Sequence, residues 1–316
     1  MSNSPYTIRN YQTADFNKYV RLNIEGEKLG PDGHSMLSQA VAENLGRPNY
    51  SPEQDLFIVE IAENIVGYLD VTTELPIGRV ILDCWVHPEH RRKGLATKLF
   101  SYALNRAEEL GARVAHVNIV RDNTAAESVL TRLDFKFVRR FLELRLDITA
   151  VRWQDIDQSV RDCCHLQPGE EDKLTRIQNR VFAGTWGYNP NTVEEVIYRT
   201  NLSGCSPEDV MLTCDGDKVV GYCWTGVTGV GAAAGGAGKG RIFMIGADPD
   251  YRGGGVGKRV LLAGLAHLKS KGLQVTDLTV DSENKAACAL YRSVGFQVRT
   301  SSLWYEKVLN QGTGTR

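Results

Sequence analysis

The sequence lacks both a strong net charge and a long apolar run. Its 316 residues include 37 Lys and Arg against 38 Asp and Glu, which leaves a formal net charge of −1 at pH 7. Near-neutrality gives no global attraction to nucleic acid or to a membrane surface, although local anion sites are compatible with it. No apolar run approaches the ~20 residues that span a bilayer, and Met1–Asn10 shows no signal-peptide pattern. We therefore expect a cytoplasmic protein with no nucleic-acid or membrane partner.

The sequence also lacks a cysteine or histidine framework. The cysteines number 7 and none lies in a C-x-x-C motif, which argues against both a disulfide scaffold and a zinc site. We interpret them as buried reduced thiols, with the neighbours Cys163 and Cys164 left open as a reactive pair. The 6 histidines show no metal-ligand spacing. We expect His87, His90 and His116 at the surface or in strands, and we predict no metal.

What the sequence does contain is an internal repeat. Blocks of the first half recur in the second half in the same order, at a constant offset of 161 residues. The paired blocks are His87–Ala96 with Asp248–Gly257, Gly111 with Gly272, Asn123–Ala126 with Asn284–Ala287, and Asp134–Phe135 with Gly295–Phe296. Upstream, Ile65–Tyr68 matches Val219–Tyr222 at an offset of 154, so the second copy holds seven extra residues. They fall within Gly226–Gly240, whose small-residue composition predicts a flexible surface loop.

The repeat predicts two domains, at residues 1–147 and 148–316, joined through Thr149–Gln158. Each is long enough for its own core. Each copy has the pattern of a helix, three strands, a long helix, a strand, a short helix and a closing strand. In the first copy the predicted ranges are Asp15–Lys28, Asp55–Ala62, Ile65–Thr72, Val80–Val86, Gly94–Leu110, Val114–Val120, Thr124–Leu133 and Phe137–Leu146. In the second they are Glu171–Phe182, Asp209–Cys214, Lys218–Trp224, Arg241–Ala247, Gly257–Lys271, Val275–Val280, Lys285–Val294 and a last strand. This order predicts an α+β fold (α/β with a mixed sheet).

A glycine turn precedes the long helix of each copy. It reads Arg91-x-x-Gly94-x-Ala96 in the first and Arg252-x-x-Gly255-x-Gly257 in the second. Small residues let a ligand approach the backbone, and the first N–H groups of a helix are unpaired, so the pattern predicts a phosphate-binding turn. The alternative is a glycine turn that merely starts a helix.

Other phosphate motifs fit this turn less well. A P-loop needs Ser or Thr after Gly-Lys, whereas Arg259 follows Gly257-Lys258 here. A dinucleotide fingerprint requires a last glycine where this chain has Lys258.

The order of strand, Arg-x-x-Gly-x-Gly/Ala, helix, strand, Asn-x-x-Ala, helix and Gly-Phe resembles the GNAT family of acyl-CoA N-acyltransferases. The resemblance covers both copies, so it implies two tandem GNAT-like domains and acetyl-CoA as the donor. The tandem layout, the length and the stretch Arg176–Gly184 further resemble the mycothiol synthase subfamily, whose members acetylate the cysteine amine of a sugar-linked thiol precursor.

The resemblance implies which residues bind CoA. A backbone N–H near Gly246 or Ala247 would polarise the thioester carbonyl. In the second copy the implied residues are Ile245, Gly246, Ala247, Arg252, Gly253, Gly254, Gly255, Val256, Gly257, Lys258, Asn284 and Ala287. In the first copy they are Val86, His87, Arg91, Arg92, Lys93, Gly94, Leu95, Ala96 and Asn123.

Tyr291 is the implied catalytic acid. It would protonate the departing CoA sulfur, and because the thiolate is itself a tolerable leaving group, the phenol is helpful rather than indispensable. The alternative is a core aromatic residue, with Leu290 beside it. The first copy has Leu130 at the matching position, so we expect the first domain to bind an acyl-CoA at most and the second to catalyse.

The general base is not evident from the sequence. Many relatives carry Glu early in the strand before the glycine turn, whereas this chain has Arg241 there. A cation at that place disfavours an ammonium-bearing acceptor and could hold a carboxylate or phosphate instead. The candidate substitutes are Glu194, Glu195, Asp209 and Glu283, or an amine that loses its proton to water. Three aromatic residues are candidates to line an acceptor pocket, with ordinary packing as the alternative: Trp186, Tyr188 and Trp224.

These observations favour an N-acetyltransferase that acts on a primary amine of a small molecule, such as a cysteinyl or aminosugar compound. Two alternatives remain open: acetylation of a protein N-terminus or lysine, and a non-catalytic CoA-binding sensor. An internal duplication can stand in for a dimer, so we expect a monomer or a weak dimer.

Overall fold

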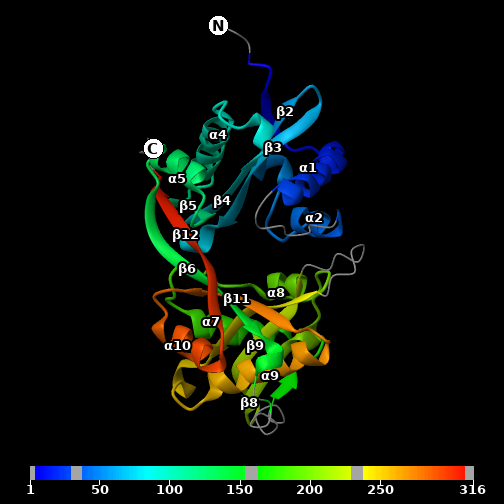
Figure 1. Ribbon diagram of the computed structural model, residues 1–316, viewed down its shortest axis with the longest axis vertical. Helices are drawn as coiled ribbons and strands as arrows, with labels where there is room; N and C mark the ends of the chain where they lie inside the picture. The colour runs from blue at the N-terminus through cyan, green and yellow to red at the C-terminus, as the bar shows by residue number, and fades with distance from the viewer. Residues whose placement is uncertain (1–3, 30–37, 152, 154–162, 229–237, 310–316) are drawn as a thin grey trace, which may run out of the picture. The chain divides into compact units, whose positions relative to one another are not determined.

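The computed structural model describes residues 4–29, 38–151, 153, 163–228 and 238–309 (Figure 1). The elements of the first half are β1 (Thr7–Asn10), α1 (Phe16–Leu29), α2 (Ser38–Leu45), α3 (Pro52–Asp55), β2 (Leu56–Ile61), β3 (Asn64–Glu74), β4 (Arg79–Val86), α4 (Leu95–Glu109), β5 (Val114–Val120), α5 (Thr124–Arg132) and β6 (Lys136–Asp147). Those of the second half are β7 (Cys163–His165), α7 (Glu171–Phe182), α8 (Val193–Thr200), β8 (Val210–Asp215), β9 (Lys218–Thr228), β10 (Lys239–Ala247), α9 (Val256–Ser270), β11 (Val275–Asp281), α10 (Lys285–Val294) and β12 (Gln297–Val308). The predicted helices and strands are all present, with ends that shift by a few residues.

Five elements were not predicted, namely α2, α3, α8, β1 and β7. Of these, α8 has a readable start signal, because Thr192 and Glu195 form a capping box in which each side chain accepts the other's backbone N–H. The predicted loop at Gly226–Gly240 falls mainly on 229–237, and the predicted connection Thr149–Gln158 mainly on 154–158. Both stretches lie outside the described residues.

The chain forms two compact units that exchange their last strands. One unit runs to Arg139 and takes in the chain again from Ser302, and the other comprises Arg140–Ser301. In the first unit the strand order is β1-β2-β3-β4-β5-β12, and in the second it is β7-β8-β9-β10-β11-β6. The predicted boundary at Asp147 therefore divides the two sequence copies but does not divide the compact units.

The exchange follows from strand pairing that local sequence does not encode. β6 closes the first sequence copy, yet its residues Phe141–Asp147 pair antiparallel with β11. β12 closes the second copy, and its residues Ser302–Val308 pair antiparallel with β5. Both strands contain a stretch in which buried residues alternate with more exposed ones, and each follows the short helix of its own copy, so local sequence does not say which sheet either strand completes. The parallel pair is β4 with β5 in the first unit and β10 with β11 in the second.

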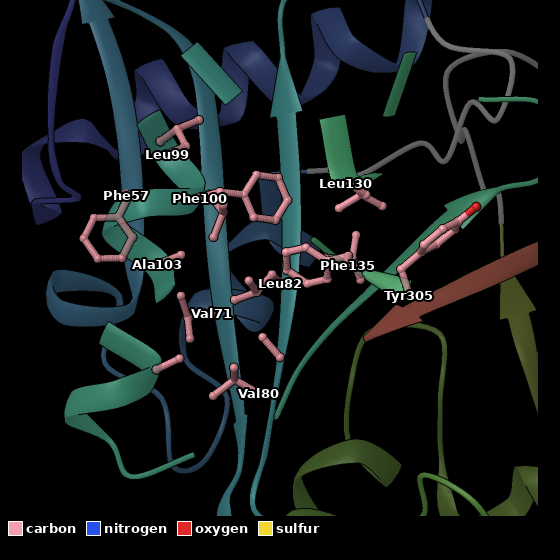
Figure 2. Close-up of a cluster of buried hydrophobic side chains, with 14 of the residues drawn as sticks. Phe57, Val71, Val80, Leu82, Leu99, Phe100, Ala103, Leu130, Phe135 and Tyr305 are labelled. Carbon is pink, nitrogen blue, oxygen red and sulfur yellow. The ribbon is translucent and has the colours of Figure 1, made fainter. Parts of the chain in front are cut away.

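Each unit has its own apolar core. In the first unit, Figure 2 shows Phe57, Leu82, Phe100 and Phe135 among the buried side chains of α4, α5 and the sheet. The rings of Phe100 and Phe135 meet edge to face with centroids 5.7 Å apart, a favoured aromatic geometry.

The second unit has a core on each face of its sheet. On the α9 side the buried cluster includes Leu261 and Leu278, and on the α7 and α8 side it includes Leu174, Val196 and Tyr222. The apolar spacing of α7 explains why that helix lies on the sheet, since Leu174, Ile177 and Val181 share one face.

All seven cysteines are free thiols, as expected, but the expectation that they are buried is correct for only two of them. Cys223 and Cys288 are buried, whereas Cys164 and Cys214 are exposed. The difference arises because β7 and the end of β8 lie at the edge of their sheet, where apolar-looking strand residues still face solvent.

Candidate active site

In the second unit, the parallel strands β10 and β11 separate partway along their length. They pair at Gly240–Thr276, Arg241–Asp277 and Ile242–Leu278, and no further pair follows in these strands. β10 continues to Ala247 and β11 to Asp281. The register of β10 with β9 shifts between Ile242 and Met244, which marks a β-bulge. The edge of β10 that faces β11 is therefore without a pairing strand where Ile245, Gly246 and Ala247 lie.

The first unit has the same separation. β4 and β5 pair in parallel at Arg79–Val114, Val80–Ala115 and Ile81–His116, and β4 then continues to Val86. Two gaps between parallel strands at matching places are what the duplication predicts. In each, a strand edge with unused backbone donors is available to a ligand.

A glycine turn leads from the separated strand into the long helix of each unit. Gly255 is the N-cap of α9 with φ +81°, and Gly94 is the N-cap of α4 with φ +75°. A glycine cannot supply a capping side chain, and neither helix has a side-chain cap. The first N–H groups of α9, including those of Val256, Gly257 and Lys258, therefore lack intrahelical acceptors. Together with the helix dipole they form an anion-binding end.

The space beside this turn is open. A β-carbon built at Gly253, Gly255 or Gly94 would meet no protein atom within 4 Å. Glycine is required there by the left-handed backbone and not by close packing of the protein against itself. In the first unit, Arg92 occupies the place of Gly253 with φ +62°, a strained conformation for a residue with a side chain. The room at these positions fits a ligand that approaches the backbone.

Asp248 anchors the turn of the second unit. Its side chain is fully buried, its carboxylate accepts from Arg180 Nε at 2.8 Å, and Lys218 Nζ lies 3.1 Å away. It also accepts the N–H of Asp250 at 3.0 Å. Burial by itself would raise the pKa of Asp248, but hydrogen bonds from Arg180, the Asp250 amide and Lys218 outweigh it and lower the pKa to about 2. The carboxylate thus stays ionised and fixes the start of the turn to α7 and β9.

The basic side chains of the two turns differ in how they are held. Arg252 donates to the carbonyl of Val181 at 3.1 Å, and Arg91 donates to the carbonyl of Val86 at 2.8 Å. Lys93 donates to the Tyr6 hydroxyl at 2.8 Å. The predicted donor-binding residues of the second unit that are solvent-exposed are Arg252, Gly253, Gly254, Gly255, Lys258 and Asn284. Those that are half-buried are Ile245, Gly246, Ala247, Gly257 and Ala287, and Val256 is buried.

The predicted ligand-binding asparagines have a structural role. Asn284 caps α10, where its Oδ1 accepts the Ala287 N–H at 3.1 Å. Asn123 caps α5 in the same way, accepting the Ala126 N–H at 3.1 Å. The repeated Asn-x-x-Ala motif is therefore accounted for as a helix N-cap. A contact between Asn284 or Ala287 and the donor stays a prediction.

Tyr291 lies on α10 within the α9-side core of the second unit. It is 6 % exposed, and its ring meets that of Phe296 edge to face at 5.8 Å. Burial raises the pKa of the Tyr291 phenol above its ordinary value, so the group carries its proton throughout the physiological range. Leu130, the matching residue of the first unit, is a fully buried core side chain. Leu290 packs toward the start of α9, with its Cδ2 3.5 Å from a β-carbon built at Gly257.

Asp209, one of the candidate bases, is paired with basic side chains. Asp209 accepts from His267 Nε2 at 2.9 Å and also pairs with Lys271, both at the C-terminal end of α9. Burial by itself would raise the pKa of Asp209, but these hydrogen bonds lower it. Twelve helical residues separate Gly255 from His267, which is about 18 Å, so Asp209 is remote from the glycine turn.

The other candidate bases are on α8 and beside α10. Glu195 completes the capping box of α8 by accepting the Thr192 N–H at 2.9 Å. Glu194 and Glu283 are exposed. No carboxylate predicted as the base is thus shown to lie at the separation of β10 and β11, and the role of Glu194 or Glu283 stays a prediction.

The three candidate pocket aromatics separate in the structure. Trp224 is 3 % exposed in the α7-side core. Tyr188 donates to Asn179 Oδ1 at 2.7 Å and stacks on Phe182. Trp186 is half-buried, with its ring centroid 6.0 Å from that of Phe141. Trp224 therefore packs in the core and Tyr188 belongs to a polar network, while Trp186 extends from the α7–α8 loop toward β6.

His87, Glu89 and His90 form a cluster that the sequence analysis did not single out. They offer one potential ligand atom each, all within 4.8 Å of one another. His87 Nδ1 accepts the Glu89 N–H at 3.3 Å, and His90 Nδ1 is 3.0 Å from the Tyr6 hydroxyl. The Nδ1 atoms of the two histidines thus take part in hydrogen bonds around the first glycine turn. That the protein uses no metal stays a prediction.

Both units thus combine separated parallel strands with a glycine turn and a helix start that has no side-chain cap, an arrangement that can hold an anionic ligand. The sequence pattern of the Acetyltransferase (GNAT) family matches residues 26–135 and 172–296. The chain therefore belongs to this family, carries two of its domains in tandem and is an acetyltransferase.

Two curated proteins are similar to this chain over most of its length. A mycothiol acetyltransferase from Amycolatopsis mediterranei is 30 % identical over 285 residues, covering 85 % of this chain and 92 % of the relative. A mycothiol acetyltransferase from Saccharomonospora viridis is 28 % identical over 288 residues, covering 85 % and 92 %.

Solved structures agree with the fold. A GCN5-related N-acetyltransferase from Sphaerobacter thermophilus superposes with a TM-score of 0.71 and 20 % identity, covering 98 % of each chain. A tandem GNAT protein from the clavulanic acid biosynthesis pathway superposes with a TM-score of 0.70 and 13 % identity, covering 96 % of this chain and 99 % of that one. Among the described residues, no helix combines the length and apolarity needed to cross a bilayer.

Proposed function

We propose that the Arg140–Ser301 unit transfers an acetyl group from acetyl-CoA to a primary amine of a small molecule. One observation carries the proposal: the gap between β10 and β11, the uncapped start of α9 and Tyr291 occur together in this unit. The first unit has the first two features but has Leu130 in place of the phenol.

The donor fits the residues that are present. The diphosphate of CoA binds to the free N–H groups at the start of α9, where Arg252 and Lys258 add positive charge. The pantetheine arm follows the unpaired edge of β10 as an added strand. A backbone N–H near Gly246 or Ala247 then donates to the thioester oxygen and stabilises the negative charge that develops there.

The transfer balances with few protein groups. The neutral amine nitrogen attacks the carbonyl carbon, the C–S bond breaks, and the electron pair leaves on sulfur. Tyr291 gives its proton to that sulfur, and the nitrogen, which became positively charged on attack, loses a proton to water or to a carboxylate and leaves a neutral amide. Because burial disfavours the Tyr291 phenolate, the phenol is protonated before each turnover and regains its proton afterwards.

The names of the relatives support an acceptor that resembles a mycothiol precursor, with a cysteinyl amine on an aminosugar. Arg241 is the residue that argues for a different acceptor. Amines of amino acids, aminosugars, polyamines and cysteinyl glycosides therefore belong in one screen. Release of the CoA thiol, measured with the full chain and each amine, tests the function. If none of these amines causes thiol release, the proposed function is contradicted.

Paired variants identify the unit that catalyses. Gly255→Glu places a carboxylate where the diphosphate binds, so we expect it to abolish thiol release. Gly94→Glu makes the same change in the first unit and serves as the matched control. We expect turnover to survive Gly94→Glu, and equal loss in both variants contradicts the assignment of catalysis to the second unit.

For the first unit we propose acyl-CoA binding without catalysis, because it combines the strand separation and the glycine turn with Leu130. Calorimetric titration of CoA into the wild type then gives two sites per chain. A single site that Gly94→Glu leaves unchanged contradicts binding in the first unit.

A further inference from the structure

Arg241 lies at the point where β10 and β11 separate. Its partner on β11 is Asp277, and the last paired position follows directly at Ile242. Ile242 packs in the core on the α9 side, so alternation along the strand turns Arg241 to the opposite face, which α7 and α8 share. The same alternation places Thr279 and Glu143 on that face, because Leu278 and Leu144 belong to the α9-side core.

The Arg241 guanidinium is only loosely neutralised. It donates to the Thr279 hydroxyl at 2.6 Å, while the carboxylate of Glu143 is 3.6 Å away, beyond ordinary hydrogen-bond distance. The side chains of Arg241 and Glu143 are 26 % and 32 % exposed. By contrast, Arg145 on the same face makes two hydrogen bonds to Asp277, at 2.7 and 2.6 Å. Arg145 therefore has a short two-point contact with a carboxylate, whereas the carboxylate contact of Arg241 is long.

The surface beside Arg241 is partly apolar. Gly226 is its partner on β9, and Phe243 lies over that glycine, since a β-carbon at Gly226 would overlap the Phe243 ring. Phe243 is 42 % exposed. A cation next to a partly exposed ring, on the α7 and α8 face of a strand that leads to Gly246, combines the charged and apolar contacts of a small-molecule subsite.

We infer that Arg241 binds an anionic group of the acceptor, a carboxylate or a phosphate. This inference rests on the proposed function, because it assumes that an amine reaches the thioester near Gly246. Arg241 lies five residues before Gly246, about 16 Å along the strand. The length of the Arg241 side chain shortens this distance, but the anionic group of the acceptor must still be several bonds away from its amine. An α-amino acid, whose carboxylate is two bonds from its nitrogen, is too short to use both points.

Arginine suits this task because its planar donors match the geometry of carboxylate and phosphate oxygens. Binding an anion there replaces the long contact to Glu143 with a short, charge-assisted hydrogen bond. Glu143 and Thr279 hold the guanidinium in place when no ligand is bound, so they act as positioning residues.

The test compares amines that are matched except for the distant group. One set is 6-aminohexanoate, 6-aminohexan-1-ol and hexane-1,6-diamine, and the other is glucosamine 6-phosphate against glucosamine. Thiol release by the full chain gives kcat/KM for each. We expect the anionic member to be preferred roughly tenfold or more, through KM, in at least one set. The two sets distinguish a carboxylate from a phosphate.

Variants connect the preference to the residue. Arg241→Gln removes it by raising KM for the anionic amine alone, and Arg241→Lys retains much of it. Arg241→Glu shifts the preference toward the diamine. The matched control is Arg299→Gln, which removes an arginine whose Nη1 is 3.9 Å from Asp277 on the same unit and leaves the preference unchanged.

Each outcome decides the matter. A wild type that accepts amines without favouring the anionic ones overturns the inference and leaves the proposed function standing. A preference that persists in a folded Arg241→Gln also overturns it. Absence of thiol release with every amine overturns the proposed function, and the inference with it.

Discussion

Replacing Gly255 by alanine tests whether the turn before α9 binds the donor. The position has φ +81° and no protein atom within 4 Å of a built β-carbon. Alanine there clashes with nothing in the protein and only places a side chain in a left-handed conformation. That costs about 1–2 kcal/mol of stability. Any larger effect must come from what normally lies against the turn.

The expected effect on binding can be worked from the free N–H groups of α9. If a diphosphate lies against them, the added methyl group displaces it from at least one charged hydrogen bond. Such a bond contributes about 1.5–3 kcal/mol, so CoA binds about 10- to 100-fold more weakly. Calorimetric titration measures the affinity, and thermal denaturation measures the stability change.

Two matched controls separate binding from backbone strain. Gly272 follows the C-terminal end of α9 with φ +78° and equally open surroundings, so Gly272→Ala has the same strain and no ligand nearby. Gly94→Ala repeats the change at the first turn and leaves turnover unchanged. If Gly255→Ala binds CoA as tightly as Gly272→Ala, the reasoning about the turn is refuted.

Three further predictions concern side chains of the second unit. Tyr291→Phe lowers kcat about 10- to 100-fold with little change in KM. Because burial raises the pKa of the Tyr291 phenol, its titration does not affect the wild-type rate below pH ~10. A variant whose kcat equals that of the wild type across the pH range refutes the role of Tyr291 as acid. Asp248→Asn lowers stability by about 1–3 kcal/mol and weakens CoA binding. The folded pKa of about 2 is below the ~3.9 of an exposed aspartate. The contribution of Asp248 to stability is therefore complete above pH ~4 and is lost as the pH falls through 2. Acid denaturation of wild type and variant checks this, and parallel curves of stability against pH contradict it. Asp209→Asn lowers the free energy of unfolding by about 2–4 kcal/mol, because buried charges lose their partner. The kcat per folded molecule stays the same. A collapse of kcat in a variant with an intact fold would make Asp209 a candidate base again.

The strand exchange shows where sequence reasoning reaches its limit. The element ranges of both copies follow from local periodicity, and α7 (Glu171–Phe182) and α10 (Lys285–Val294) have the predicted bounds. The boundary at Asp147 did not divide the compact units, because β6 and β12 present equivalent edges and only the assembled sheets choose between them.

The sequence by itself determined the duplication, the order of elements, the two glycine turns and the difference between Tyr291 and Leu130. These are local properties: a left-handed residue needs glycine, and a helix repeats its apolar face every three or four residues. Only the tertiary structure decided that Asp209 is fixed to the far end of α9, that Trp224 is a core residue, and that Arg241 has Glu143 as a distant neighbour. Such relations depend on which strands pair across a sheet, and residues far apart in the chain carry no local signal of that pairing.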